Sequence, residues 1–230
     1  MVKKMTSEGF DGGAALDVLV VVTVLVAVKQ ALLPHSQLYA GPISTLTAMG
    51  VATALLRRQG SAWRDLGFVW PQSWLSTGGL TLLTMGVFIA ATQLMALIAD
   101  AYFVDVNYGS RFDHVEGNLI AYLTIMILVW THGSFFEELL FRAFLITKLG
   151  VTFGGTRATM VVALIASSAF FGYRHAYYQG LHGALITGAG GFAFGLMYIC
   201  FGRTNIMPII LAHGAFNTLG QTFRFLGIED

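Results

Sequence analysis

Long apolar stretches constrain this chain more than any other feature of its sequence. A membrane-spanning helix needs about 20 consecutive, mostly apolar residues, and several stretches meet that requirement: 14–33, 38–56, 78–99, 118–149, 157–173, 183–201 and 206–225. The alternating pattern of a membrane β-barrel is absent, and an open sheet leaves its backbone groups without partners in lipid. The sequence therefore predicts an all-α, polytopic transmembrane helix bundle of about seven spans, within a range of six to eight.

The composition excludes several other classes of protein. Charged residues make up 11% of the chain and apolar residues 56%, whereas a soluble domain carries about 25% charged residues. So few charges cannot cover a water-exposed surface, which disfavours a cytosolic enzyme. A net charge of +1 gives no electrostatic attraction to nucleic acid, so no nucleic-acid partner is expected. The lone Cys200 cannot form a disulfide within the chain.

Basic residues in the loops predict the orientation of the bundle, because lysine and arginine are enriched in short cytoplasmic loops. One side of a seven-span bundle carries Lys3, Lys4, Arg57, Arg58, Arg64, Lys148, Arg157 and Arg203. The other side carries Arg111, Arg174 and Arg224 together with Asp100, Asp105, Asp113 and Glu116. The N-terminus is therefore expected in the cytoplasm and the C-terminus on the opposite side. Lys29, near the end of the first span, is expected to snorkel to the interface.

We expect one integrated membrane domain with two parts. Residues 1–115 supply the N-terminal transmembrane helices, and a tryptophan-bearing segment at 57–76 is expected at the cytoplasmic interface. Residues 116–225 supply the catalytic helical core. The first apolar stretch is long for a signal peptide and lacks small residues at a cleavage site, which favours a retained span. The compact length indicates a multi-pass protein of a prokaryotic plasma membrane.

The fourth apolar stretch contains the densest group of charges, Glu137, Glu138 and Arg142. Each charge inside a span costs about 2.5–3.5 kcal/mol on insertion scales, so such residues indicate function. In an α-helix Glu138 and Arg142 share a face and can pair. Glu137 points elsewhere and has no local cation, which suits a general base. An ion network between helices, without any chemistry, is the alternative.

Two further segments carry polar residues in an apolar context. The segment 170–182 contains His175, and the segment 208–217 places His213 and Asn217 on one helix face at i,i+4. A carboxylate can deprotonate a water held beside an imidazole, while an imidazole or the Asn217 amide stabilises the oxyanion. Glutamate with two histidines would equally suit a zinc site formed by Glu137, His175 and His213. The H-E-x-x-H motif that would support zinc is absent.

The three segments in order resemble one family. Glu137-Glu138-x-x-x-Arg142, Phe171-x-x-x-His175 and His213-x-x-x-Asn217 are similar to the motifs of the CAAX protease and bacteriocin-processing family. These proteins, also called CPBP or Abi proteins, are intramembrane proteases related to the Ras-converting CAAX endopeptidase. The similarity covers roughly 118–220, nearly half the chain.

The resemblance implies an intramembrane active-site cavity that opens to the cytosol and lipid. It implies that Glu137 activates water held by His175, that His213 and Asn217 stabilise the oxyanion, and that Glu138 and Arg142 orient the motif. The family is named for metalloproteases, yet its proposed mechanisms include one without metal. We favour the reading without a cofactor and keep zinc or another divalent metal as the alternative.

The sequence therefore predicts an intramembrane endopeptidase that acts on a membrane-embedded or lipidated peptide or protein, with the lipid bilayer around it. Its oligomeric state is not predicted. One alternative is a non-proteolytic membrane scaffold or bacteriocin-immunity-type protein of the same fold, and a weaker one is a transporter with a buried proton relay. For the site residues to meet at one depth, either the fourth helix tilts and ends near Leu145, or the fifth starts later than Arg157 and breaks near Gly172.

Overall fold

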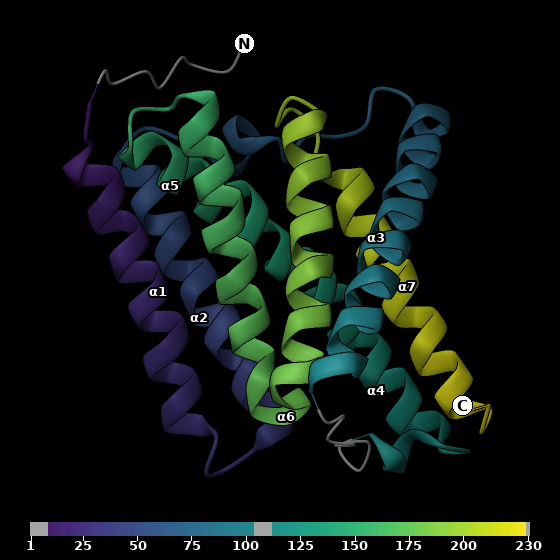
Figure 1. The fold of residues 1–230 in the computed structure, drawn as a ribbon. Helices are drawn as coiled ribbons and strands as arrows, with labels where there is room; N and C mark the ends of the chain where they lie inside the picture. Colours follow the sequence, from purple (N-terminus) through teal and green to yellow (C-terminus); the bar gives the residue numbers. More distant parts are fainter. Residues whose placement is uncertain (1–8, 104–111, 229–230) are drawn as a thin grey trace.

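The structure, a computed structural model, describes residues 9–103 and 112–228, and this part of the chain contains helices and no strands. The helices are α1 (Gly12–Leu32), α2 (Gln37–Arg58), α3 (Trp74–Tyr102), α4 (Leu119–Trp130), α5 (Thr147–Thr152), α6 (Arg157–Cys200) and α7 (Met207–Phe225). The long helices stand side by side and alternate in direction (Figure 1). The predicted all-α bundle is confirmed.

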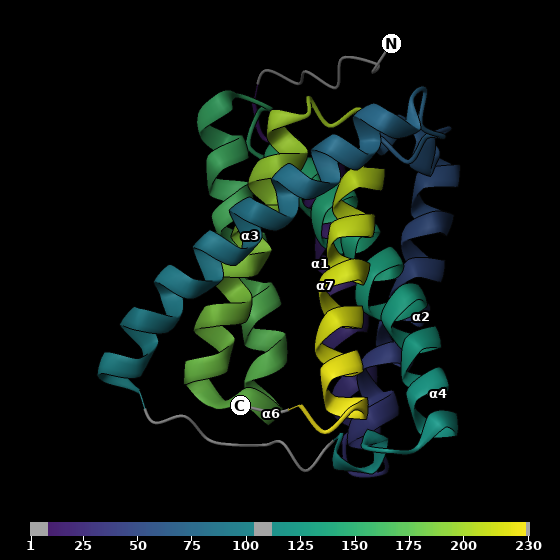
Figure 2. The same ribbon diagram turned by 90° about the vertical axis from the view of Figure 1, so that its right-hand side faces the viewer.

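Five described helical stretches are long and apolar enough to cross a membrane, namely α1, α2, α3, Leu119–Thr152 and α6. Most predicted spans match these helices to within a few residues. The predicted span 78–99, for example, lies inside α3. α7 is not among the five, although it stands between α3 and α4 in the bundle (Figure 2). The number of crossings, about seven, stays a prediction.

Backbone hydrogen bonds define the two ends of the bundle. At one end, the N–H of Asp11 donates to the carbonyl of Thr152 at 3.0 Å, and that of Ile206 donates to Gly67 at 2.9 Å. We call this the basic end, because it carries Arg57, Arg58, Arg64, Arg157 and Arg203. At the other end, the N–H of Gly117 donates to the carbonyl of Phe225 at 3.0 Å. We call this the C-terminal end.

Most of the described loop charges lie as the orientation prediction requires, but Lys148 and Arg174, on which it also depends, are buried. The C-terminal end carries Asp100, Asp113, Glu116 and Arg224. Lys3, Lys4, Asp105 and Arg111, on which the prediction also depends, lie outside the described residues. Which end faces the cytoplasm therefore stays a prediction.

The long helix from Leu119 to Thr152 contains two π-helical segments, η4 (Thr131–Phe136) and η5 (Glu138–Ile146), on either side of Glu137. A π-helix pairs residue i with residue i+5, and the Glu137 N–H accordingly donates to the carbonyl of His132. Residues five apart therefore approach the same side of this helix. Of the two alternatives for the depth of the site, an end of this helix near Leu145 does not occur, because the helix continues through η5 and α5 to Thr152.

α6 is a hairpin of two arms. Gly180 interrupts it with φ 62° and ψ −169°, a conformation that residues with a Cβ avoid. A Cβ on Gly172 would lie 2.4 Å from the Ala184 carbonyl oxygen and 3.1 Å from the Gly188 Cα, so the arms meet backbone to backbone. The predicted spans 157–173 and 183–201 lie one in each arm. The break expected near Gly172 lies at Gly180, because Gly172 is a packing contact.

The hydrophobic core fills the basic half of the bundle. Its fully buried members include Leu139, Leu140, Phe141, Phe144 and Tyr198. The Tyr198 hydroxyl donates to the Leu66 carbonyl at 2.8 Å, which ties the segment between α2 and α3 across this end. In the predicted interfacial segment 57–76, Trp70 and Trp74 are exposed, while Trp63 packs on Phe144 with 6.3 Å between ring centres.

Three cations lie inside the bundle, contrary to prediction: Lys29, Arg174 and Lys148, of which Lys148 is 2% exposed and donates to Asp17 Oδ2 at 2.6 Å. Lys29 does not snorkel: it is buried, donates to the carbonyl of Arg174 and lies 3.7 Å from the centre of the Tyr177 ring. Arg174 is a buried residue of α6, where a loop position was expected, and it donates to the Leu25 carbonyl at 3.0 Å and the Ser44 hydroxyl at 3.1 Å. Carbonyls and hydroxyls of neighbouring helices supply the partners that a buried cation requires.

Candidate active site

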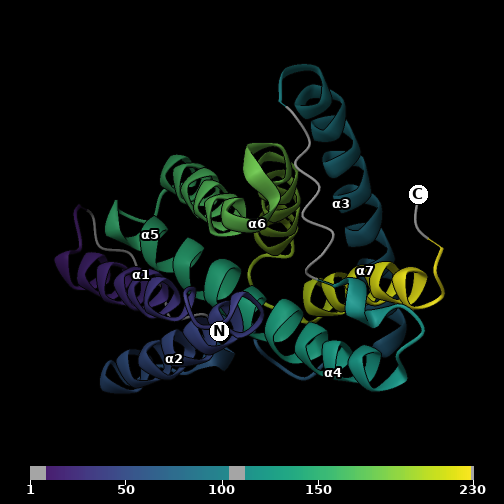
Figure 3. The same cartoon turned by 90° about the horizontal axis from the view of Figure 1, so that it is seen from below.

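A cavity of about 750 Å³ lies among α2, α3, α4, α6 and α7. It is lined by four of the predicted site residues, Glu137, His175, His213 and Asn217. Glu138 and Arg142 are buried behind this lining, 0% and 1% exposed. The fold thus brings three segments that are distant in sequence to one cavity. Figure 3, seen from the C-terminal end, shows α7 beside α4, with α6 further across the bundle.

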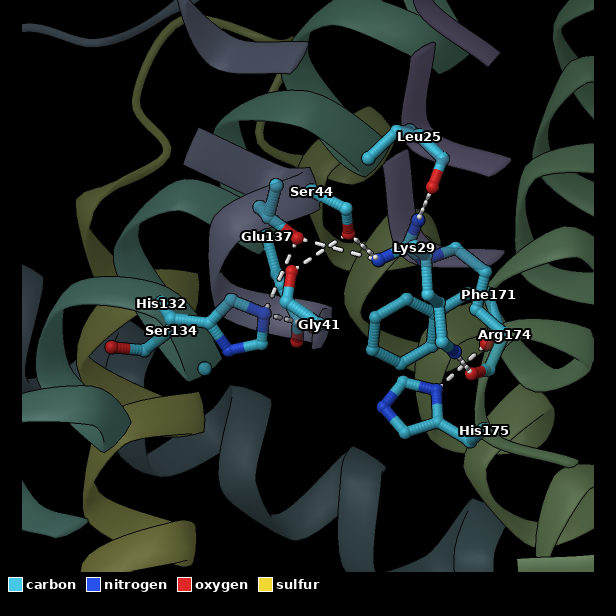
Figure 4. A network of polar contacts seen from close by, with 12 residues as sticks. Leu25, Lys29, Gly41, Ser44, His132, Ser134, Glu137, Phe171, Arg174 and His175 are labelled. Atoms are coloured by element: carbon cyan, nitrogen blue, oxygen red, sulfur yellow. Dashed lines mark hydrogen bonds and ion pairs between the residues drawn. The ribbon is translucent and has the colours of Figure 1, made fainter. Parts of the chain in front are cut away.

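Glu137 is 4% exposed and has a partner on its own helix. The Nε2 atom of His132 lies 3.6 Å from the Glu137 Oε1 atom and 3.2 Å from the Thr45 hydroxyl oxygen. Figure 4 shows His132 reaching Glu137 from one side, with Phe171 and His175 across the open space. Glu137 was expected to have no local cation; η4 brings to its side the imidazole of a residue five positions earlier, which is a cation only when protonated.

Glu138 links the first motif to the third. Its Oε2 atom lies 3.1 Å from Nε of Arg142, so the ion pair expected at i,i+4 forms. Its Oε1 atom accepts a hydrogen bond from Nδ1 of His213 at 2.7 Å. The Arg142 guanidinium lies 4.2 Å from the centre of the Phe171 ring, which adds a cation–π contact to the second motif. One carboxylate and one guanidinium therefore fix the relative positions of α6, α7 and the helix that bears Glu137.

The hydrogen bonds of the two cavity histidines determine which ring nitrogen can act. Nδ1 of His175 lies 2.8 Å from the Phe171 carbonyl oxygen. A carbonyl only accepts, so Nδ1 carries the hydrogen, and Nε2 of the neutral ring is an acceptor. The bond from His213 Nδ1 to Glu138 has the same consequence for its Nε2. Asn217 donates one N–H to the Gly133 carbonyl at 3.4 Å and keeps a second donor.

The donor set does not match a metal site. Across residues 9–103 and 112–228, no group of three or more His, Cys, Asp or Glu side chains could hold a metal ion. Zinc requires its ligand atoms to converge at about 2.0–2.2 Å. Here Glu137 faces His132, and one nitrogen of His213 is bound to Glu138. We derive no step through a metal.

The sequence led to no predicted role in the site for two residues that lie near it, His132 and Arg174. His132 lines the cavity, and its signal was an ionisable side chain inside an apolar stretch. Arg174 directly precedes His175, but its charge was attributed to a loop. Its burial depends on acceptors from α1 and α2 that no local pattern reveals.

Comparison with known proteins agrees with the motifs. Residues 119–219 match the model of the Rce1-like family, described as type II CAAX prenyl endopeptidase Rce1-like. The matched region contains all three motifs, so the resemblance drawn from them is confirmed for this part of the chain. No curated protein and no solved structure matches the chain significantly.

Proposed function

We propose, from the match of residues 119–219 to the model of the Rce1-like family of CAAX prenyl endopeptidases, that this chain is an intramembrane endopeptidase. It hydrolyses a peptide bond of a membrane-embedded or lipidated substrate, such as a prenylated protein. The shared cavity supports the proposal most directly, because Glu137, His175, His213 and Asn217 all line it. An ion network with a purely structural role has no need of a cavity.

In the proposed mechanism Glu137 is the general base. A water molecule lies between its carboxylate and Nε2 of His175, and the latter accepts a hydrogen bond from the water. Glu137 removes a proton as the water oxygen attacks the carbonyl carbon of the substrate. The protonated Glu137 then gives that proton to the leaving nitrogen as the carbon–nitrogen bond breaks. The products are a carboxylic acid and an amine, and no other reactant is required.

The negative charge on the substrate oxygen needs hydrogen-bond donors. Because an amide does not titrate, Asn217 offers its second N–H whatever the protonation of the neighbouring side chains. His213 can donate from Nε2 when its ring carries a hydrogen on each nitrogen, because its Nδ1 is already bound to Glu138. Glu138 and Arg142 therefore act as positioning residues for His213, as the motif resemblance implies.

His132 is proposed as a positioning residue for Glu137. Its ring lies 3.6 Å from one carboxylate oxygen and 3.2 Å from the Thr45 hydroxyl, which connects Glu137 to α2. A carboxylate restrained in this way presents a fixed oxygen to the water, which lowers the cost of reaching the reactive geometry.

A direct test uses the purified chain with a library of membrane-anchored peptides. Wild type is compared with Glu137→Gln, and Glu116→Gln is the matched control, because Glu116 is exposed and lies outside the cavity lining. We expect cleavage by wild type and the control and none by Glu137→Gln. Equal cleavage by all three contradicts the role of Glu137. Cellular function retained by Glu137→Gln would favour the scaffold alternative.

A further inference from the structure

A second pocket, of about 280 Å³, lies between α1 and the first arm of α6. The residues that line it differ from the described lining of the cavity that holds the candidate active site, which we call the central cavity. The proposed function therefore gives this second pocket no role.

Helical spacing brings its lining residues together. α1 supplies Val26, Lys29 and Gln30 at i, i+3 and i+4, and α6 supplies Tyr173, Arg174, Ala176 and Tyr177. Residues three and four apart share a helix face. Another face of the same arm carries Phe171 and His175 into the lining of the central cavity. Arg174 and His175 are thus adjacent in sequence but line different cavities.

Two buried cations line the second pocket. Lys29 is 5% exposed and Arg174 is 6% exposed, and the described lining contains no aspartate or glutamate. Glu137 attracts Arg174 electrostatically from the central cavity, at a longer range than an ion pair. Removing a charge from water is costly unless an opposite charge lies close to it. An anion in the second pocket would lower that cost for both cations.

Neutral acceptors hold the Arg174 guanidinium in place. It donates to the Leu25 carbonyl at 3.0 Å and to the hydroxyls of Ser44 and Thr45 at 3.1 and 3.4 Å, and Figure 4 shows it between α1 and α2. A guanidinium has five N–H donors, so these three bonds to described residues leave two for a ligand. Two donors of one guanidinium suit the oxygens of a phosphate.

The second cation is fixed at the same place. Lys29 donates to the backbone carbonyl of Arg174, and its ammonium lies 3.7 Å from the centre of the Tyr177 ring. Gln30 is exposed and adds a carboxamide donor to the lining. The pocket therefore combines two positive charges with neutral donors, which is a chemistry for an anion.

The pocket lies near the ends of two helices that are long and apolar enough to cross a membrane. Lys29 belongs to the last turn of α1, and Tyr177 lies three residues before the kink of α6 at Gly180. The ends of spans lie near the lipid head groups. Tyr173, which lines the pocket, is 61% exposed, and such an aromatic ring is typical of a surface at head-group level.

We infer that this pocket binds the phosphate of an anionic phospholipid, with Lys29 and Arg174 as its cationic contacts. Basic pockets between transmembrane helices are known to bind anionic head groups. The inference goes beyond the proposed function and makes no use of the orientation of the bundle. A free phosphate ion shares the recognised chemistry, so the test includes both sources.

The test measures binding to the purified chain in detergent. Phosphatidylglycerol, phosphatidylcholine and inorganic phosphate are titrated separately, with native mass spectrometry for the affinity and melting temperature for stability. Lys29→Gln removes one cation, and Val26→Phe fills the pocket while keeping both cations. Arg58→Gln is the control, because it removes one cation from an exposed position at the other end of α2.

We expect phosphatidylglycerol to bind wild type and Arg58→Gln equally and to raise their melting temperatures, with weaker binding of phosphatidylcholine. Lys29→Gln and Val26→Phe should each bind phosphatidylglycerol about tenfold more weakly, the effect of losing one charged hydrogen bond. If Lys29→Gln does not fold, Val26→Phe decides.

Equal affinity of all four proteins for phosphatidylglycerol would overturn the inference, as would equal affinity of wild type for the two lipids. Binding of inorganic phosphate without binding of phosphatidylglycerol would assign the pocket to the free ion and overturn the lipid assignment. Peptide cleavage plays no part in this measurement, so its outcome is separate from that of the proposed function.

Discussion

The Nε2 atom of His132 lies 3.6 Å from the Oε1 atom of Glu137, five residues further along the same helix. In an α-helix such residues point well apart, and only the π-helical segment η4 brings them together. π-helical turns occur frequently at functional sites. In this chain the irregular turn gives a buried carboxylate an imidazole partner without a contribution from another helix.

Replacing His132 should slow cleavage without unfolding the protein. His132→Ala is expected to reduce kcat by about tenfold, the equivalent of about 1.4 kcal/mol in the activation barrier, with little change in KM. Thr45→Val removes only the outer partner of His132 and should have a smaller effect. Steady-state kinetics on one membrane peptide provides the measurement, and equal kcat values for wild type and His132→Ala would contradict the positioning role.

A buried ion pair near the basic end should contribute to stability. Lys148 Nζ lies 2.6 Å from Asp17 Oδ2, with side-chain exposures of 2% and 6%. Asp17→Ala leaves Lys148 without its counter-charge and should cost about 3–5 kcal/mol in unfolding free energy. The double variant Asp17→Leu with Lys148→Met should recover most of that loss.

Denaturant unfolding in detergent measures both variants. Arg64→Gln is the control, because the Arg64–Asp65 pair is exposed and spaced at 4.0 Å, and such surface pairs contribute about 0–1 kcal/mol. An Asp17→Ala protein as stable as Arg64→Gln would show that the buried pair is not needed.

The hairpin of α6 should be sensitive to one methyl group. Gly172→Ala would place a Cβ 2.4 Å from the Ala184 carbonyl oxygen, and overpacking of this kind costs about 1–3 kcal/mol. Gly86→Ala is the control in α3, because nothing lies within 4 Å of its added Cβ. Thermal melting should separate the two, and equal melting temperatures would contradict the close approach of the arms.

Chelation should leave the activity intact. The described His, Cys, Asp and Glu side chains provide no group of three suited to a metal ion, and the mechanism relies on Glu137, His175 and Asn217. We expect equal cleavage rates before and after dialysis against a chelator, with the metal content checked by elemental analysis. Loss of activity that zinc restores would instead favour the metal site predicted as the alternative.

The sequence was sufficient for the helical class and for the approximate positions of most spans, because apolar length is a local property. It also indicated the Glu138–Arg142 pair, since residues four apart meet on any regular helix. The partner of Glu138 on α7, His213, was beyond local reasoning, as this contact joins residues 75 positions apart.

Some features could not be predicted from the sequence, because they depend on irregular backbone or on acceptors far away in the chain. The approach of His132 to Glu137 requires a π-helical turn, and a histidine and a glutamate five residues apart do not indicate such a turn. The burial of Arg174 depends on the Leu25 carbonyl and the Ser44 hydroxyl of two other helices. Lys29 was assigned to the interface for the same reason, because its acceptor lies 145 positions away.

The central claim is that Glu137 activates the attacking water, and the single-turnover cleavage rate of wild type against Glu137→Gln tests it most directly. Amide replaces carboxylate with little change in shape, so thermal stability should be retained. Loss of a general base should slow cleavage by about 10²–10⁴-fold. A Glu137→Gln protein that cleaves the same peptide at the wild-type rate would contradict the claim.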